Sequence, residues 1–191
     1  MIVKAYRAAA LVVGCLICRA AVPEGWILLG DHPANYDASV DSQAVNNGIP
    51  SACLKSIKPA PEGFGTLMQN LGATEYLGKR IRLSAFVKSA GVQAWAGLWL
   101  RVDKGKNSVA FDNMQNRPIK GTTVWQRYEV VLDVPRDATG IAFGILLAQT
   151  GAVWLNSAKL EIVDNNTPTT IAPSSLPKAP RNLDFESDRL Y

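Results

Sequence analysis

A strand-like segment in the middle of the chain, WAGLWLRVD (95–103), carries the residue types best suited to binding a sugar. Trp95, Trp99 and Arg101 share one face if the segment is a strand, because successive side chains then point to opposite sides. Indole rings stack on the apolar face of a sugar ring, and a guanidinium donates hydrogen bonds to hydroxyl groups. The pattern predicts a binding platform, unless both sheet faces are buried here and the tryptophans belong to the core.

Two polar residues extend this candidate site. If SVAFDNM (108–114) pairs with 95–103 as a hairpin through DKGKN, Asp112 would reach Arg101 as an ion pair or as half of a polar pocket. Gln69, in GTLMQN, is a further candidate. The predicted ligand-binding residues are therefore Trp95, Trp99, Arg101, Asp112 and Gln69.

Residues for catalysis are much harder to find. His32 is the single histidine, lies in the turn-like GDHPANY, and has no Ser or Cys motif beside it. The sequence has no GxSxG, no HExxH, no zinc-spaced Cys/His cluster and no glycine-rich phosphate loop. Acidic residues sit at turns or at solvent-facing strand positions, where solvation accounts for them: Asp103, Asp137, Glu129 and Asp133. We predict a non-catalytic module; a weak esterase or glycosidase is the minor alternative.

A structural calcium ion is the one metal that the sequence raises. Ca²⁺ binds carboxylate and carbonyl oxygens, and Asp31, Asp41 and Asp164 are candidate donors. No ligand pattern links the three, so the metal is undecided, and no cofactor is predicted.

The first 20 residues have the organisation of a secretory signal. Lys4 and Arg7 precede the apolar run AAALVVGCLIC, and Cys18 and Ala20 are small residues at the positions that precede cleavage after Ala20. This predicts export to the periplasm or the cell exterior. Two alternatives are open: a lipoprotein leader that ends at residue 14 and leaves an acylated Cys15, or an uncleaved anchor. Either would confine membrane contact to the leader or the lipid.

Removing this leader would change the charge and the cysteine content. The net charge of +4 would fall to +1, because three basic residues would be lost and 17 would face 16 acidic ones. Such a surface has no basic stripe for phosphates, which argues against a nucleic-acid partner. Cys15 and Cys18 have redox spacing but lie in the apolar run, so we interpret them as small apolar residues. Cys53, among apolar neighbours, predicts a buried and inert thiol.

The segments from Trp26 onward predict the fold. About ten of them alternate in period two and are separated by Gly, Pro, Asn or Asp turns. The clearest are KRIRLSAFVKS, WQRYEVVLDVP and TGIAFGILLAQ, whereas LMQNLGATEYLG could form one short turn of helix. Strands without intervening helices predict an all-β fold, an antiparallel β-sandwich of the jelly-roll type, as one domain over residues 22–164.

The composition changes after this domain. Residues 165–181 are rich in Pro, Ser and Thr, which is typical of a linker, and 182–191 form a strand-like tail that begins NLDFE. The tail is either the start of a following domain or an edge strand that folds back on the sandwich.

Several of these segments together resemble a known family. FGTLMQ, KRIRLSAFVKS, WAGLWLRVD, AFDNMQNRPIKGTT and the final IAFGILL with VWL are similar to a bacterial galactose-binding-like jelly-roll accessory domain. That domain occurs attached to transcription regulators of the arabinose-regulator type and to secreted hydrolases such as tail-specific serine peptidases. The resemblance implies an accessory binding or dimerisation role and transfers no catalytic residue. Family members commonly have two acids after VWL, where this chain has Asn156 and Ser157, which puts any role of those acids in doubt.

Overall fold

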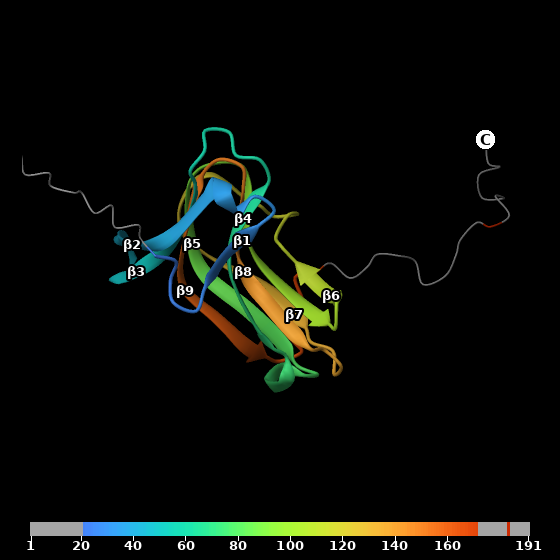
Figure 1. Ribbon diagram of the computed structural model, residues 1–191. Coiled ribbons are helices and arrows are strands. Elements are labelled where there is room, and N and C mark those ends of the chain that lie inside the picture. Colours follow the sequence, from blue (N-terminus) through green and yellow to red (C-terminus); the bar gives the residue numbers. More distant parts are fainter. Residues whose placement is uncertain (1–20, 172–182, 184–191) are drawn as a thin grey trace, which may run out of the picture.

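The computed structural model describes residues 21–171 and residue 183 (Figure 1). The predicted leader, with Cys15 and Cys18, and nearly all of the predicted tail lie outside the described residues. Two short 3-10 helices, η1 (Pro33–Asn35) and η2 (Thr74–Tyr76), lie in loops, and η2 falls where a turn of helix was predicted. The remaining elements are strands: β1 (Ile27–Gly30), β2 (Tyr36–Asn46), β3 (Ile49–Ser56), β4 (Phe64–Gly72), β5 (Arg80–Lys104), β6 (Asn107–Asp112), β7 (Ile119–Asp133), β8 (Gly140–Ala148) and β9 (Ala152–Val163).

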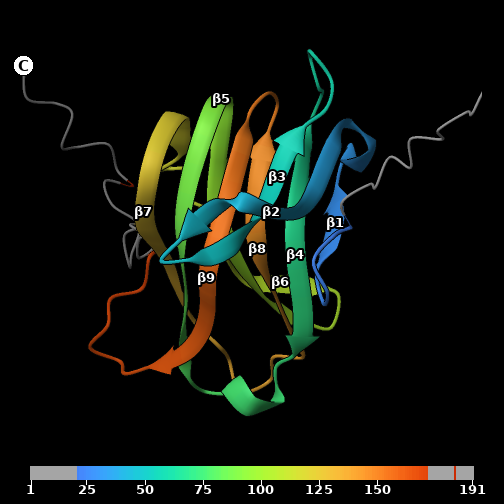
Figure 2. The same ribbon diagram turned by 90° about the vertical axis from the view of Figure 1, so that its left-hand side faces the viewer.

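The strands form two antiparallel layers that share β5. The first sheet has the order β1-β4-β8-β5-β6, and uses residues 95–104 of β5. The second sheet has the order β2-β3-β9-β5-β7, and mainly uses residues 80–90 of the same strand. Figure 2 shows β7, β5, β9 and β3 of the second sheet side by side. This arrangement confirms the predicted all-β sandwich.

The 25-residue β5 differs from the prediction of two separate strands at 79–89 and 95–103. Its pairing with β7 shifts register three times between Val87 and Ala96, and Gly91 there has a φ of 58°. Bulges of this kind bend and twist a strand without ending it. The predicted turn is therefore a bend that carries the chain from one sheet to the other.

The core lies between the two sheets and follows the predicted alternation. Ile81, Leu83 and Val87 of β5 are buried, as are Ile141, Ile145 and Leu147 of β8. Strand β8 is buried on its outer face as well, because Ala142 and Leu146 belong to a second apolar cluster with Met68 and Trp99. That second cluster forms the base of the candidate site.

Residues after β9 return to the sandwich. The Arg80 guanidinium donates hydrogen bonds to the carbonyl oxygens of Asn165 and Thr167, at 2.8 and 2.7 Å. The backbone N–H of Thr170 donates to the carbonyl of Val131 in β7, and the N–H of Val131 donates to the Thr170 hydroxyl. The predicted linker thus begins with residues that contact the edge of the second sheet. No helix within residues 21–171 is long and apolar enough to cross a membrane.

Cys53 is buried in β3, and its burial raises the pKa of the thiol to about 11. The prediction of a buried thiol is confirmed. Because the thiolate is the reactive form, we expect Cys53 in the folded protein to resist alkylation by iodoacetamide at pH 8 and to react fully in denaturant. Peptide mapping by mass spectrometry measures this at Cys53 alone. Rapid labelling of Cys53 under native conditions would contradict the buried position.

Candidate ligand-binding site

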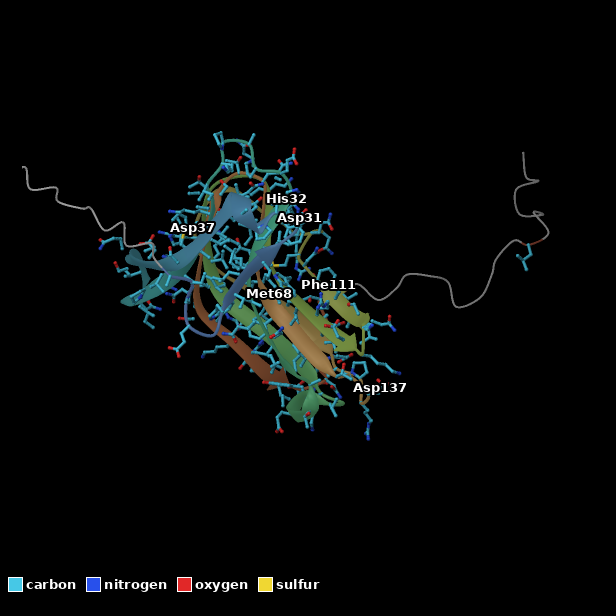
Figure 3. All side chains as sticks on the ribbon, in the orientation of Figure 1. Asp31, His32, Asp37, Met68, Phe111 and Asp137 are labelled. Atoms are coloured by element: carbon cyan, nitrogen blue, oxygen red, sulfur yellow. The ribbon has the colours of Figure 1, made fainter. Side chains whose placement is uncertain are left out.

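A cleft of about 420 Å³ crosses the outer face of the first sheet. All five strands of this sheet, β1, β4, β8, β5 and β6, supply residues that line it. Met68 on β4 and Phe111 on β6 mark two of its sides and can be located in Figure 3. The side chains that line the cleft belong to Leu29, Phe64, Thr66, Met68, Asn70, Trp99, Arg101, Phe111 and Leu146.

Trp99 forms the floor of the cleft. Its side chain is 6% exposed, and its indole N–H donates a 2.7 Å hydrogen bond to the hydroxyl of Thr66. The Thr66 hydroxyl in turn donates to the carbonyl of Ile145, at 2.9 Å. These bonds fix the indole in place, because a buried N–H without an acceptor would cost stability.

The cleft wall is apolar and partly open. Phe111 is 47% exposed and meets Trp99 edge to face, with ring centroids 6.4 Å apart. Leu29 of β1 is exposed to the same extent on the opposite side. A fixed floor with exposed walls leaves apolar area for a ligand to cover.

The polar groups gather at one end of the cleft. The Nε of Arg101 lies 3.0 Å from one carboxylate oxygen of Asp103 and 3.1 Å from the other. Among the described residues, the hydrogen bonds of the Arg101 side chain use its Nε, and the side chain is 43% exposed at the cleft. Asn70 is exposed beside it. This end offers donors and acceptors together, with the cation balanced by an anion.

The structure brings only two of the five predicted site residues into the cleft, Trp99 and Arg101. Trp95 lies on the same face but packs half-buried against the second apolar cluster and does not line the cleft. Gln69 points to the opposite side of β4, because its neighbours Met68 and Asn70 are the residues that face the cleft. The predicted stacking of a sugar on both tryptophans therefore does not match this geometry.

The predicted contact between Asp112 and Arg101 is wrong. Strand β6 pairs Ser108 with Asp103, but next pairs Ala110 with Val102, so Val109 is an extra residue. The bulge shifts the register by one and reverses the faces. Phe111 then points into the cleft, and Asp112 turns to the inner side, opposite Leu100.

Asp112 instead joins three segments. Its carboxylate accepts hydrogen bonds from Arg117 at 2.7 and 3.1 Å, from the Thr170 hydroxyl and from the Met114 N–H. Burial alone would raise the pKa of Asp112, but these hydrogen bonds outweigh it and hold the pKa below its usual range. Asp112 is thus a structural residue that ties the 113–117 turn and the returning 165–170 segment to β6.

The remaining acids and His32 do not converge on a reaction centre. Asp103 pairs with Arg101, Asp137 with Lys104, Asp133 with Arg80, and Glu129 with Arg127. His32 lies in an exposed turn, 3.5 Å from the Asp31 carboxylate. Asp41 accepts from the Trp154 indole and Asp164 from the Asn166 N–H, so the three candidate calcium ligands are apart. Among the described residues, no group of three or more His, Cys, Asp or Glu could hold a metal ion.

A second aromatic group lies on the outer face of the second sheet. The Lys88 ammonium sits 4.6 Å from the ring centre of Trp154 and 5.4 Å from that of Trp125. The cation of the protein itself already occupies these ring faces. We therefore assign these two tryptophans to packing and not to a ligand site.

Seven side chains of the cleft escaped prediction: Leu29, Phe64, Thr66, Met68, Asn70, Phe111 and Leu146. Met68 and Thr66 lie on the same face of β4 by period two, so the strand pattern contained that signal. The position of Phe111 could not be predicted in this way, because it depends on the bulge in β6.

Sequence and structure comparisons place the chain among known proteins. No family model matches it. An uncharacterised HTH-type transcriptional regulator, YbfP of Bacillus subtilis strain 168, is 45% identical over 169 residues, which is 86% of this chain. The chain spans only 57% of that regulator's length.

Three solved structures share the fold at low identity. The enzymatically active domain of bacteriophage CBA120 tailspike protein 4 has a TM-score of 0.57 at 16% identity, over 73% of this chain and 20% of its own. The CBM22-1 xylan-binding domain of Paenibacillus barcinonensis Xyn10C has a TM-score of 0.53 at 15% identity, over 76% and 90%. A second module of carbohydrate-binding family 16 has a TM-score of 0.50 at 16% identity, over 66% and 86%. These matches confirm the jelly-roll sandwich.

Proposed function

We propose that this domain is a non-catalytic carbohydrate-binding module that holds a neutral sugar in the cleft of the first sheet. The observation that carries the proposal is the combination of an apolar floor and walls, Trp99 and Phe111, with the Arg101–Asp103 pair at one end. Structural neighbours that bind polysaccharides, such as the xylan-binding domain, support it by fold.

The chemistry of the cleft suits a pyranose ring. The C–H face of the ring would cover Phe111 and Trp99, while its hydroxyls would accept from Arg101 and donate to Asp103. Because Asp103 balances the charge of Arg101, a carboxylate or phosphate on the ligand gains little from the cation. The arrangement favours a neutral glycan over an acidic one.

A binding role also fits the absence of paired acids in the cleft. Among the described residues, Asp103 is the one acid at its polar end, whereas sugar hydrolysis uses two carboxylates flanking the bond. We further propose that the module is exported, on the basis of the leader predicted at residues 1–20, with lipidation at Cys15 as the alternative. Fractionation of cells that produce the full chain tests the location.

A second function has its own support. The 45% identity with a longer HTH-type regulator favours an accessory role, in which the domain binds a sugar or a second copy for a larger protein. The same role could serve a secreted hydrolase. Sedimentation velocity with and without oligosaccharides discriminates: a ligand-independent dimer favours dimerisation, and a monomer that binds glycans favours the first proposal.

The binding proposal is tested at Phe111. We expect Phe111→Ala to weaken binding of the best glycan on an array by about tenfold while leaving the melting temperature nearly unchanged, because the ring is half exposed. Val109→Ala is the matched control, since Val109 lies in the same strand, is 43% exposed and does not line the cleft. Isothermal titration measures both. The absence of any glycan ligand, or equal effects of the two substitutions, would contradict the proposal.

A further inference from the structure

A second cavity of about 420 Å³ continues the cleft along the same sheet face. The two cavities share Met68, Asn70 and Arg101, so they meet at the polar end of the first. The second one extends to the ends of β4 and β8, at Gly72 and Gly140. From Thr66 to Gly72 the groove follows seven residues of one strand, which are six steps or about 20 Å.

Two paired glycines, Gly72 and Gly140, line the second cavity. Gly72 and Gly140 pair directly across β4 and β8, and Gly140 pairs on its other side with Asp103. A Cβ on Gly72 would meet nothing within 4 Å, and one on Gly140 would approach only the Leu71 carbonyl oxygen, at 3.8 Å. Neither glycine has a positive φ.

These two glycines therefore lack the usual structural reasons for glycine in a strand. Gly144, further along β8, is different, because a Cβ there would collide with the backbone of β4 at Leu67 and Met68. Gly72 ends β4 and Gly140 begins β8. Glycine in a strand can mark a place where a ligand approaches the backbone closely. The effect of Gly72 and Gly140 is to leave a flat area clear of side chains.

Polar groups flank this flat area. Arg101 and Asp103 extend from β5, and Asn70 extends from β4, so each borders the second cavity. A sugar ring lying on the glycines would thus reach the same donors and acceptors as a ring lying on Trp99. Arg101 lies between the two positions, because it lines both cavities, whereas Asp103 lies beside Gly140 in the second.

We propose that the Gly72–Gly140 floor is a second sugar subsite, and that the ligand is a linear neutral oligosaccharide that fills both cavities and passes over Arg101. This inference rests on the proposed function of the first cavity. It predicts that affinity rises with chain length, and that an added side chain at Gly72 affects long ligands only.

The test uses the full 191-residue chain and a panel of neutral probes, which are xylo-, cello- and manno-oligosaccharides of one to six sugar units. For the series that binds, we expect the hexasaccharide to bind at least about tenfold more tightly than the disaccharide. Gly72→Val should remove most of that gain and change disaccharide affinity less than about twofold. Gly140→Ala is a second, milder variant, and Ala158→Val, at an exposed strand position on the second sheet, is the control.

The outcomes separate the two proposals. If no probe binds the wild-type chain, the proposed function fails and this inference fails with it. If a probe binds and depends on Phe111, but its affinity is independent of length or insensitive to Gly72→Val and Gly140→Ala, only the second subsite is overturned. Melting temperatures of the glycine variants equal to or above that of the wild type exclude misfolding as the cause, because valine and alanine suit an open strand position better than glycine.

Discussion

Trp99→Ala should abolish measurable glycan binding and lower the free energy of unfolding by about 3–5 kcal/mol. Both effects have one cause. The indole is buried between Met68, Leu146 and Phe111, and it forms the floor against which a sugar ring would lie. Removing it leaves a cavity beneath the cleft and frees the Thr66 hydroxyl of its N–H partner. Isothermal titration and urea unfolding measure the two losses.

Trp99→Phe separates stability from binding. It keeps an aromatic floor but loses the hydrogen bond to Thr66 and part of the packed ring, so we expect a cost of about 1–3 kcal/mol and binding within a few-fold of wild type. Trp95→Phe, on the same strand and face but outside the cleft, is the matched control and should leave the affinity unchanged. A folded Trp99→Ala protein with full affinity would show that the ligand binds elsewhere.

The strand pattern contained most of the fold. Alternation in β5 and β8 identified the stripes that face the core, because successive side chains of a strand point to opposite faces. It could not show that residues 80–104 form one strand. The bend at Gly91 is a set of bulges, and a glycine between two apolar stripes is equally typical of a turn.

The site was predictable only as far as a single strand determines it. Trp99 and Arg101 share a face within β5, so their placement in the cleft followed from the sequence. The position of Asp112 relative to them depends on the pairing of two strands, and one extra residue, Val109, reversed it. A hairpin without the bulge would have placed Asp112 beside Arg101 and turned Phe111 inward. An error of one residue in the register of β6 therefore puts Asp112 in the cleft in place of Phe111.

The cleft and the Asp112–Arg117 ion pair lie on opposite faces of β6. The strand therefore contributes both to the candidate site and to the stability of the fold. Phe111 presents an exposed ring to a ligand, whereas Asp112 holds the turn and the returning chain in place. Substitutions at the two positions should consequently affect different measurements. This separation can be tested most directly at Asp112.

Asp112→Ala should lower the free energy of unfolding by about 3 kcal/mol, at the low end for a broken buried pair because Arg117 is one-third exposed. Asp112→Asn should show the pH dependence of the pair. The pKa of Asp112 is depressed in the folded chain, so its contribution is complete above the unfolded pKa and is lost as pH falls through the lower, folded value. We therefore expect the stability difference between wild type and Asp112→Asn to shrink steadily below about pH 4.

Urea unfolding between pH 2 and pH 7 measures this difference. Asp137→Asn is the control, because its ion pair with Lys104 is exposed and its loss should leave the unfolding midpoint nearly unchanged. A difference that stays constant with pH would show that the Asp112 carboxylate is not held by Arg117 and Thr170. A folded Asp112→Asn protein should also bind glycans as the wild type does, because its side chain faces away from the cleft. Loss of affinity in that folded variant would mean that the 113–117 turn, and not only Phe111, shapes the site.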